Sequence, residues 1–303
     1  MVLGDRMKTS NAVLPPFLLL DRLLQDWLLE DIGRGDRTTG SLLSNNPRTG
    51  KAKWIAKEAG IIAGLPIAAR VFQLLNEQVK FTALVAEGER CDFPPGMPSE
   101  SKPVIATIEG PLDALLTGER VAINLAMRLS GIATMTSKYV AQIADLPAQL
   151  ADTRKTTPGL RILEKYATQV GGAVNQRMGL DDGVLIKDNH IAAAGSIGKA
   201  IAQIRDRIPY TLTIEVETET LDQVKEAIEH QADIIMLDNM PIEMMRQAVQ
   251  IIRDKSNGIK IEASGNVTLE TIRAVAETGV DYISSSAPIT RSTWLDLSMR
   301  MSD

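Results

Sequence analysis

Cysteine and histidine are nearly absent from this chain. Among its 303 residues there are one cysteine, Cys91, and two histidines, His190 and His230. A single cysteine cannot form an internal disulfide or a cysteine-rich zinc site, and two histidines supply little for a zinc cluster. A catalytic metal in this protein would therefore have to be a hard cation that is held by carboxylate oxygens.

The sequence also lacks a long apolar run and an excess of positive charge. The apolar run nearest the N-terminus, 17–20, is broken by Asp21 and Arg22 and is too short for a signal peptide or a membrane span, so we expect a cytoplasmic protein with no membrane partner. The net charge of −5 argues against nucleic acid as a main partner, since a duplex attracts a basic surface. The proportions of hydrophobic (44%) and charged (23%) residues are those of a globular protein.

The first part of the chain, to about residue 116, is expected to be an α/β module with short strands. Residues 1–10 are expected to form a loose tail, and the helical spacing of apolar residues in 17–30 predicts a helix that packs on a core or on a partner subunit. The two glycines of segment 31–39 predict a loop. Strand-like runs follow at 51–56, 61–64, 80–85 and 104–111.

The second part of the chain is predicted to be a parallel α/β structure. Two helices, 117–129 and 134–144, are expected on either side of Gly131. Beyond residue 147, short apolar runs alternate with helical patterns, which is typical of βα units. The strands are predicted at 149–151, 183–186, 211–214, 233–237, 259–261 and 280–283. Polar residues follow almost every strand, and this favours a barrel, whose strand ends meet on one rim, over an open sheet, which gathers ligands at one switch point.

Cationic residues are concentrated in one short span of this acidic chain, and they are Arg154, Lys155, Arg161, Lys165, Arg177 and Lys187. Several follow strand ends, so they predict a site for an anionic small molecule, because guanidinium groups bind carboxylate and phosphate in a bidentate way. For Arg161 and Lys165, on the following helix, a merely solvated position is an alternative. Lys187 follows a buried strand, and it could neutralise phosphate, form a Schiff base or make a structural salt bridge.

Two acidic residues, Glu217 and Asp238, are expected to end successive strands and thus to be neighbours on the rim. Among cations, such a pair predicts either a hard metal such as Mg²⁺, bound also by water and substrate phosphates, or ion pairs with the lysines. Glu215 lies two residues before Glu217, so in a strand it points the same way. The choice of metal ligand between these two glutamates therefore stays open.

The segment Ser264-Gly265-Asn266 has the features of a phosphate-binding turn. It closes a predicted strand and precedes Thr268, which is a candidate helix N-cap. Free backbone N–H groups at such a helix start can bind phosphate, and late strands of α/β barrels often carry this kind of site. The three serines at 284–286 are expected to face the turn.

These residues lie in a series of seven motifs. The segments are 30–39, 118–124, 128–134, 152–159, 185–190, 235–239 and 262–266, which read EDIGRGDRTT, GERVAIN, RLSGIAT, DTRKTTPG, LIKDNH, IMLDN and EASGN. In these motifs and their order, the chain resembles the quinolinate phosphoribosyltransferase family, also called nicotinate-nucleotide pyrophosphorylase (carboxylating). The resemblance runs from about Leu18 to Leu297, and several long motifs in the right order make it specific.

The resemblance implies transfer of a phosphoribosyl group from 5-phosphoribosyl 1-pyrophosphate to quinolinate, with decarboxylation to nicotinate mononucleotide in NAD biosynthesis and with Mg²⁺ as cofactor. It also implies an N-terminal α/β sandwich (residues 1–116, joined by about 290–303) and a C-terminal, incomplete α/β barrel (117–289). A homodimer, or an oligomer of dimers, is implied as well, in which Arg120 of one subunit reaches the active site of the other.

By the same resemblance, each part of the substrate pair has its own set of residues. The residues implied for the two carboxylates of quinolinate are Arg154, Lys155 and Arg177. Those implied for the metal and the ribose hydroxyls are Glu217 and Asp238, and those for the 5-phosphate are Ser264, Gly265 and Asn266. Lys187 is implied near the reacting centre or the pyrophosphate. The expected catalytic residues are Lys155, Lys187, Glu217 and Asp238, and further substrate-binding residues are Thr153, Gln176, Ser285 and Ser286.

Two positions depart from the pattern of the family. Where the family usually has a histidine before an arginine, this chain has Gln176, which donates a hydrogen bond but cannot be a cation, so we expect weaker carboxylate binding or a shifted pH dependence. Ser286 stands in a turn that normally contains glycine, and it either adds a phosphate contact or crowds the phosphate. Three other functions stay open: a related protein linked to molybdenum uptake, a Schiff-base enzyme that uses Lys187 on a phosphorylated sugar, and a non-enzymatic phosphometabolite-binding or scaffold protein.

Overall fold

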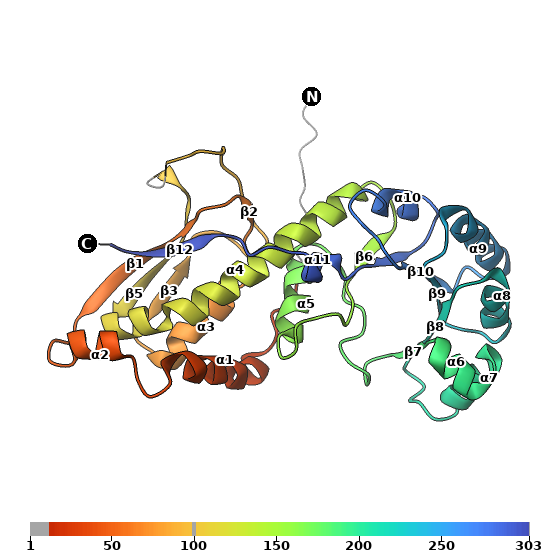
Figure 1. Ribbon diagram of the computed structural model, residues 1–303, viewed down its shortest axis with the longest axis horizontal. Helices are drawn as coiled ribbons and strands as arrows, with labels where there is room; N and C mark the ends of the chain where they lie inside the picture. The colour runs from red at the N-terminus through yellow and green to blue at the C-terminus, as the bar shows by residue number, and fades with distance from the viewer. Residues whose placement is uncertain (1–11, 99–100, 303) are drawn as a thin grey trace. The chain divides into compact units, whose positions relative to one another are not determined.

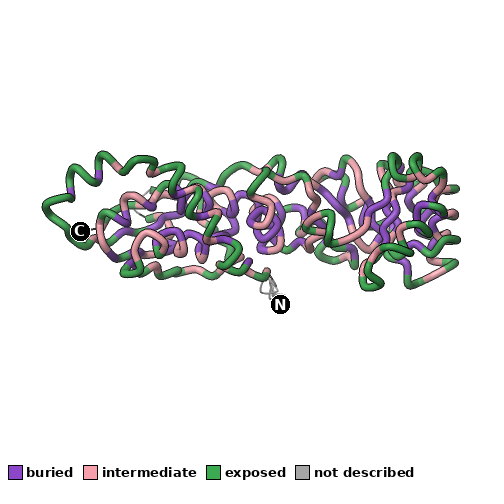
Figure 2. The backbone as a smooth tube through the Cα atoms, turned by 90° about the horizontal axis from the view of Figure 1, so that it is seen from below, coloured by how far each residue is buried: buried purple, intermediate pink, exposed green. Residues whose placement is uncertain are grey.

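In the computed structural model, residues 12–98 and 101–302 are described, and the chain divides into two compact units. The first comprises Met1–Met135, Ile162–Gly172 and Ser292–Asp303, and the second comprises Thr136–Arg161 and Ala173–Arg291. The expected tail, 1–10, lies outside the described residues. The domain limits expected near 116 and 290 stay a prediction. Within each unit, buried residues run through the middle and exposed residues cover the outside (Figure 2).

The first unit is built on a four-stranded antiparallel sheet with the strand order β12-β1-β5-β3 (Figure 1). Its strands are β1 (Thr49–Ala56), β3 (Lys80–Ala83), β5 (Val104–Pro111) and, from the end of the chain, β12 (Leu297–Ser302). The short strands β2 (Gly60–Ile61) and β4 (Arg90–Cys91) form a separate pair. Trp54 and Phe72 are fully buried, and their rings form a T-shaped, edge-to-face contact with a centroid distance of 6.4 Å, which marks the core of this unit.

The helix predicted for 17–30 is confirmed as α1 (Phe17–Ile32), and it contacts α3 (Leu65–Leu75). The predicted loop 31–39 is shorter than expected, because α2 (Arg37–Leu43) begins inside it. Asp36 is the N-cap of α2, and its carboxylate accepts a hydrogen bond from the backbone N–H of Thr39 at 2.9 Å. A capping aspartate therefore ends the glycine loop earlier than the glycines alone suggest.

A single long helix, α4 (Leu112–Gln142), replaces the two helices predicted on either side of Gly131. A Cβ atom at Gly131 would lie 1.9 Å from the backbone oxygen of Thr293, so this glycine allows the C-terminal segment to approach the helix and does not end it. Arg120 is consequently an exposed residue within α4, and its expected place at a helix start is wrong. No helix in the described part of the chain, α4 included, is long and apolar enough to cross a membrane.

The second unit is built on a six-stranded parallel sheet with the strand order β6-β11-β10-β9-β8-β7. The strands are β6 (Gln149–Ala151), β7 (Val184–Ile186), β8 (Ile214–Thr218), β9 (Ile234–Asp238), β10 (Lys260–Ser264) and β11 (Tyr282–Ser284). From β7 to β11 they follow chain order, and β11 then pairs with β6, which is the order of an α/β barrel. On the other side of β6, the described residues form one bridge, from Ala151 to Val174, and no ladder to β7, so the barrel is incomplete.

Helices alternate with these strands, and they are α6 (Asp188–Ala194), α7 (Ile197–Arg205), α8 (Leu221–Glu229), α9 (Ile242–Lys255), α10 (Ile272–Ala276) and α11 (Ala287–Thr290). In Figure 1, α7, α8 and α9 lie next to one another on the outside of the strands. The helix after β6, α5 (Arg161–Val170), belongs to the first unit from residue 162 onward. Lys165 on α5 is fully buried, so the solvated alternative for this lysine is wrong.

One strand is offset from its predicted position. The apolar run 211–214 predicts a strand, but β8 begins only at Ile214 and contains both Glu215 and Glu217. The apolar residues Ile214 and Val216 alternate with the glutamates and are buried on the opposite face of the strand. The prediction ended at Ile214, whereas the strand continues through both glutamates and is charged on the face that lines the cavities described next.

Candidate active site

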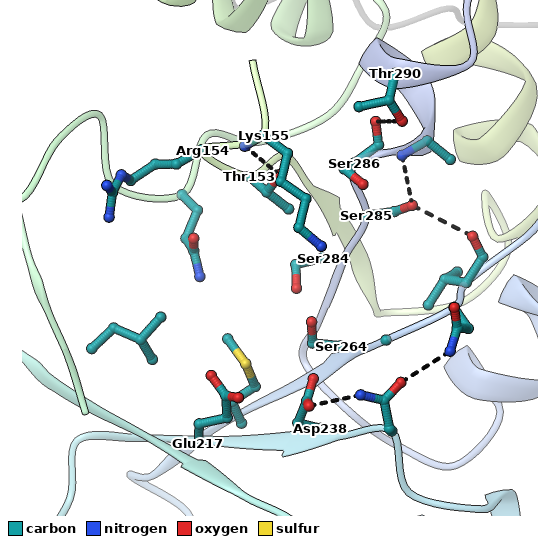
Figure 3. Close-up of a pocket in the computed structure, with 18 of the residues that line it drawn as sticks. Thr153, Arg154, Lys155, Glu217, Asp238, Ser264, Ser284, Ser285, Ser286 and Thr290 are labelled. Atoms are coloured by element: carbon teal, nitrogen blue, oxygen red, sulfur yellow. Dashed lines mark hydrogen bonds between the residues drawn. The ribbon is translucent and has the colours of Figure 1, made fainter. Parts of the chain in front are cut away.

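A cavity of about 680 Å³ is formed at the carboxyl ends of the strands in the second unit (Figure 3). All residues that line it belong to that unit. Of the catalytic and substrate-binding residues that the family resemblance implies, the structure brings together there all but one, namely Thr153, Arg154, Lys155, Gln176, Arg177, Lys187, Glu217, Asp238, Ser264, Gly265, Asn266, Ser285 and Ser286. The exception is Arg120, which is part of the first unit and does not line this cavity.

Two arginines in the cavity wall, Arg154 and Arg177, act on each other electrostatically. Burial lowers the pKa of Arg177, and the positive charge of Arg154 lowers that pKa further. Arg177 donates one hydrogen bond from Nη1 to the backbone oxygen of Gly183, at 2.9 Å. The Nε atoms of both arginines are buried and have no hydrogen-bond partner within the described chain. Two like charges with buried, unused donors indicate a binding site for an anionic group.

Arg161 does not line the cavity, but it forms hydrogen bonds with the two segments that carry Arg154 and Arg177. Its Nε donates to Thr156 Oγ1 at 3.0 Å, and its Nη1 donates to the backbone oxygen of Met178 at 3.2 Å. Thr156 lies two residues after Arg154, and Met178 directly follows Arg177. Arg161 is therefore a link between two loops, and a merely solvated position is wrong for it as well.

Basic and acidic side chains face each other across the cavity. In Figure 3, Lys155 points into it from one side, and Glu217 and Asp238 point into it from the opposite side. The ammonium group of Lys187 forms an ion pair with Glu217, which is the salt bridge that the sequence left as one of three alternatives. The Lys187 side chain is 46% exposed. Lysines that form Schiff bases are activated by an apolar pocket or a neighbouring cation, so this half-exposed, carboxylate-paired lysine does not favour that chemistry.

Of the two glutamates on β8, only Glu217 lines this cavity. Glu215 is buried and lines a second cavity of about 490 Å³, whose walls include the first residues of β6, β7, β9, β10 and β11. Gln176 and Arg177 line both cavities. The geometry therefore separates the two glutamates, and it favours Glu217 as the one available to a metal or substrate at the carboxyl ends of the strands.

The turn 264–266 lies at the end of β10, as expected, but the helix after it begins later than expected. α10 begins at Ile272 with Thr271 as its N-cap, so the prediction of Thr268 as the N-cap is wrong. Thr268 is part of a turn instead, in which its backbone N–H donates to Thr271 Oγ1 at 2.9 Å. On the neighbouring strand end, Ser286 has a φ of −85°, an ordinary conformation that does not require glycine.

Asn239 is a cavity residue to which the sequence reasoning gives no role. Its φ of 51° is a left-handed conformation that few residues other than glycine adopt. Its Nδ2 donates to Asp238 Oδ2 at 2.7 Å, and its Oδ1 accepts from Asn266 Nδ2 at 3.2 Å (Figure 3). Gly265 packs against it, since a Cβ atom there would lie 2.2 Å from Asn239 Oδ1. Asn239 thus connects the Asp238 carboxylate to the turn 264–266.

The fold and the cavity define an α/β-barrel enzyme with a site for small anionic substrates. Two sequence profiles match the chain: the N-terminal domain of quinolinate phosphoribosyl transferase over residues 36–130, and the C-terminal domain over residues 132–300. The chain belongs to the quinolinate phosphoribosyltransferase family, as the motifs predicted.

Relatives match almost the whole chain. It is 58% identical over 288 residues to a probable nicotinate-nucleotide pyrophosphorylase (carboxylating) of Synechocystis sp., a match that covers 95% of this chain and 94% of the relative. For the protein of the same description in Bacillus subtilis, the identity is 45% over 282 residues, with 93% of each chain covered. The crystal structure of NadC from Streptococcus pyogenes is 41% identical with a TM-score of 0.86, and it covers 96% of this chain and 98% of its own. These similarities confirm the predicted two-part α/β fold.

Proposed function

We propose that this protein is a nicotinate-nucleotide pyrophosphorylase (carboxylating). It transfers a phosphoribosyl group from 5-phosphoribosyl 1-pyrophosphate to quinolinate and releases pyrophosphate and CO2. The observation that carries this proposal is the single cavity that combines two arginines with unused donors, two carboxylates and the turn 264–266. Quinolinate is a dicarboxylate and the other substrate carries phosphate groups, so the combination fits both. Family membership and the 58% identity to the Synechocystis relative support the same reaction.

The arginine side of the cavity is proposed to bind quinolinate. Arg154 and Arg177 would each hold a carboxylate through the planar guanidinium group, with the buried Nε as one of the donors. Lys155, which points into the cavity, would neutralise further negative charge. Thr153 and Gln176 complete this part of the wall.

The opposite side of the cavity is proposed to bind 5-phosphoribosyl 1-pyrophosphate together with Mg²⁺. The residues proposed for the 5-phosphate are Ser264, Gly265, Asn266, Ser285 and Ser286. Among the described residues there is no group of three or more histidine, cysteine, aspartate or glutamate side chains that could hold a metal ion. The carboxylates of Glu217 and Asp238 fit Mg²⁺, which usually completes its coordination with water and phosphate oxygens and would here neutralise pyrophosphate charge.

The proposed reaction has two stages. The nitrogen of quinolinate attacks the anomeric carbon of the ribose as the bond to pyrophosphate breaks, and positive charge develops on that carbon. Positioned charges therefore supply most of the catalysis, and Lys187, held by Glu217, is proposed to balance the charge of the leaving pyrophosphate. In the second stage the carboxylate next to the ring nitrogen leaves as CO2, and the carbanion that remains on the pyridinium ring takes up a proton.

We also propose a homodimer, or an oligomer of dimers, with shared active sites. Arg120 is exposed on α4 and lines no part of the cavity, which agrees with a role in the site of a partner subunit. The side chains of Leu18 and Leu19 on α1 are 91% and 58% exposed. Neighbouring exposed leucines of this kind support an association surface on the first unit.

The test of the reaction is the joint release of pyrophosphate and CO2 by the purified protein. It is incubated with Mg²⁺, 5-phosphoribosyl 1-pyrophosphate and quinolinate, and nicotinate replaces quinolinate in the control. We expect equal release of both products with quinolinate and no pyrophosphate with nicotinate. Pyrophosphate release with nicotinate would contradict the carboxylating specificity, and no release from folded protein would contradict the proposed reaction.

Replacement of Asn239 with alanine is expected to raise the KM for 5-phosphoribosyl 1-pyrophosphate about tenfold, because groups that orient a ligating carboxylate commonly contribute this much. The KM for quinolinate should stay close to the wild-type value. Steady-state kinetics with each substrate in turn at saturation separates the two constants. Gln231→Ala is the matched control, since Gln231 also has a positive φ, 58°, and does not line the cavity. Equal constants in Asn239→Ala and wild type would rule out this role.

A further inference from the structure

Two segments of the second unit carry the arginines that are proposed to bind quinolinate. Segment 152–160 follows β6 and carries Arg154, and segment 173–183 precedes β7 and carries Arg177. Burial lowers the pKa of Arg177 and the charge of Arg154 lowers it further, so the two guanidinium groups are close enough to repel each other. This repulsion favours separation of the segments, and the spacing of the two arginines therefore depends on contacts that hold the segments together.

Before each arginine, the segments are joined by Asp152, which is 2% exposed. Its backbone N–H donates to the oxygen of Val174 at 3.1 Å. Its carboxylate accepts hydrogen bonds from the side chain of Asn175 and from the backbone N–H of Gln176. These contacts fix the backbone that leads into each arginine.

After each arginine, the segments are joined by Arg161, the first residue of α5. Its Nε donates to Thr156 Oγ1 at 3.0 Å. Thr156 in turn donates to the backbone oxygen of Arg154, from its N–H at 2.9 Å and from Oγ1 at 3.5 Å. The Nη1 of Arg161 donates to the oxygen of Met178, the residue after Arg177, at 3.2 Å. One guanidinium group thus connects the backbone at Arg154 with the backbone at Arg177.

We propose that Arg161 is a positioning residue that sets the spacing between Arg154 and Arg177, and that this spacing selects a ring with carboxylates on adjacent carbons. This inference rests on the proposed function. Arg161 does not line the cavity, so it acts through the two segments and not through contact with the substrate. A guanidinium group suits the role, because its planar fork directs donors to two acceptors in a fixed geometry. Arginines that are held in place before binding lose less entropy when the substrate arrives.

Two unreactive dianions test the spacing, because they have the same charge and differ in the distance between their carboxylates. Benzene-1,2-dicarboxylate has the spacing of quinolinate, benzene-1,3-dicarboxylate has a wider one, and neither has a ring nitrogen that could attack the ribose. The experiment measures their inhibition constants against quinolinate in the full-length enzyme with Mg²⁺ and saturating 5-phosphoribosyl 1-pyrophosphate. The wild type should bind the 1,2-isomer at least about tenfold more tightly than the 1,3-isomer.

In Arg161→Ala, the inhibition constant of the 1,2-isomer and the KM for quinolinate should each rise about tenfold, as is common when a group that orients a binding residue is lost. The inhibition constant of the 1,3-isomer should change less than about twofold. The kcat should fall less than about threefold, because saturating quinolinate draws the two arginines into place. Arg161→Lys keeps the charge but cannot join both segments, so it should resemble the alanine variant.

Arg205→Ala is the matched control and should keep the wild-type constants. Arg205 also donates to backbone oxygens in the same unit, those of His230 and Gln231, and it does not line the cavity. Thr156 provides a second test that does not depend on the folding of an Arg161 variant. Thr156→Val removes the hydroxyl group that accepts from Arg161 and should lower the preference for the 1,2-isomer about threefold, whereas Thr156→Ser keeps the hydroxyl group and should retain the preference.

Equal weakening of both isomers in Arg161→Ala, with wild-type constants in Arg161→Lys, would assign the effect to charge alone and overturn the proposal. An unchanged preference in Arg161→Ala, or a wild type that binds both isomers equally, would overturn it as well. Failure of the wild type to release pyrophosphate from quinolinate would contradict the proposed reaction instead. Calorimetric titration of the two isomers needs no turnover, so it tests the spacing in that case and keeps the two failures distinguishable.

Discussion

Replacement of Arg154 with alanine should lower kcat/KM for quinolinate about 100-fold or more, because a half-buried guanidinium group that is proposed to pair with a carboxylate is lost and the partner charge stays uncompensated. The fold should remain intact, since the Nε of Arg154 has no hydrogen-bond partner within the described chain. The measurements are steady-state kinetics at saturating 5-phosphoribosyl 1-pyrophosphate and a thermal melt of the same sample.

Two further variants make this result specific. Arg154→Lys keeps the positive charge but loses the bidentate geometry, and we expect a loss of about tenfold, intermediate between wild type and alanine. Arg207→Ala removes an exposed arginine just after α7 in the same unit, and it should leave the kinetics unchanged. Wild-type turnover in Arg154→Ala would contradict the assignment of the arginine side to quinolinate.

Replacement of Gly131 with alanine is expected to lower the free energy of unfolding by about 3 kcal/mol, which is the upper part of the range for overpacking. The added Cβ would lie 1.9 Å from the oxygen of Thr293 and 3.1 Å from the Cα of Trp294. Both are backbone atoms, so no side-chain rotation relieves the clash. The segment is also tied to α4 by a hydrogen bond of 3.0 Å from Leu295 N to the oxygen of Met127, which the displacement would strain.

Gly40→Ala is the matched control for this prediction. Gly40 lies within the helix α2, and a Cβ atom there would meet no other atom within 4 Å. Alanine should therefore stabilise the protein by about 0.5–1 kcal/mol through helix propensity alone. Denaturant unfolding of both variants gives the comparison. If Gly131→Ala unfolded at the wild-type midpoint, the close approach of the C-terminal segment to α4 would be disproved.

The sequence predicts the barrel and most of the cavity for one physical reason. In a parallel barrel the polar residues that follow the strands converge on one rim, so Arg154, Lys187 and Asp238 can be placed near one another before any coordinates are known. Close approaches between segments that are far apart in the sequence cannot be predicted in this way. Gly131 reads as a helix end, because the sequence does not show that Thr293 packs against it.

Pairings across the barrel are also hidden from the sequence. In the sequence, Glu262 is part of a motif and Gln176 is a departure from the family pattern. The hydrogen bond between their side chains joins segments that are 86 residues apart, and the sequence does not predict it. For Asn239, the residue type was the one signal available in the sequence. Asparagine tolerates the left-handed backbone conformation better than most residues, and Asn239 adopts it. The offset of β8 follows from the same limit, because register depends on pairing with β9 and not on the apolar run alone.

The pairing of β12 with β1 bears on how the chain folds during synthesis. Six residues of β1, from Lys51 to Ala56, pair with Ser302 to Leu297, close to the end of the chain. Strand β1 can pair with β5 once residues 104–111 have been made, but its other edge stays unpaired until residues 297–302 have been made. The strands of the barrel are all complete by residue 284, so the second unit can form first. Such an open strand edge is a site of aggregation, which makes the synthesis of β12 a protective step for the nascent chain.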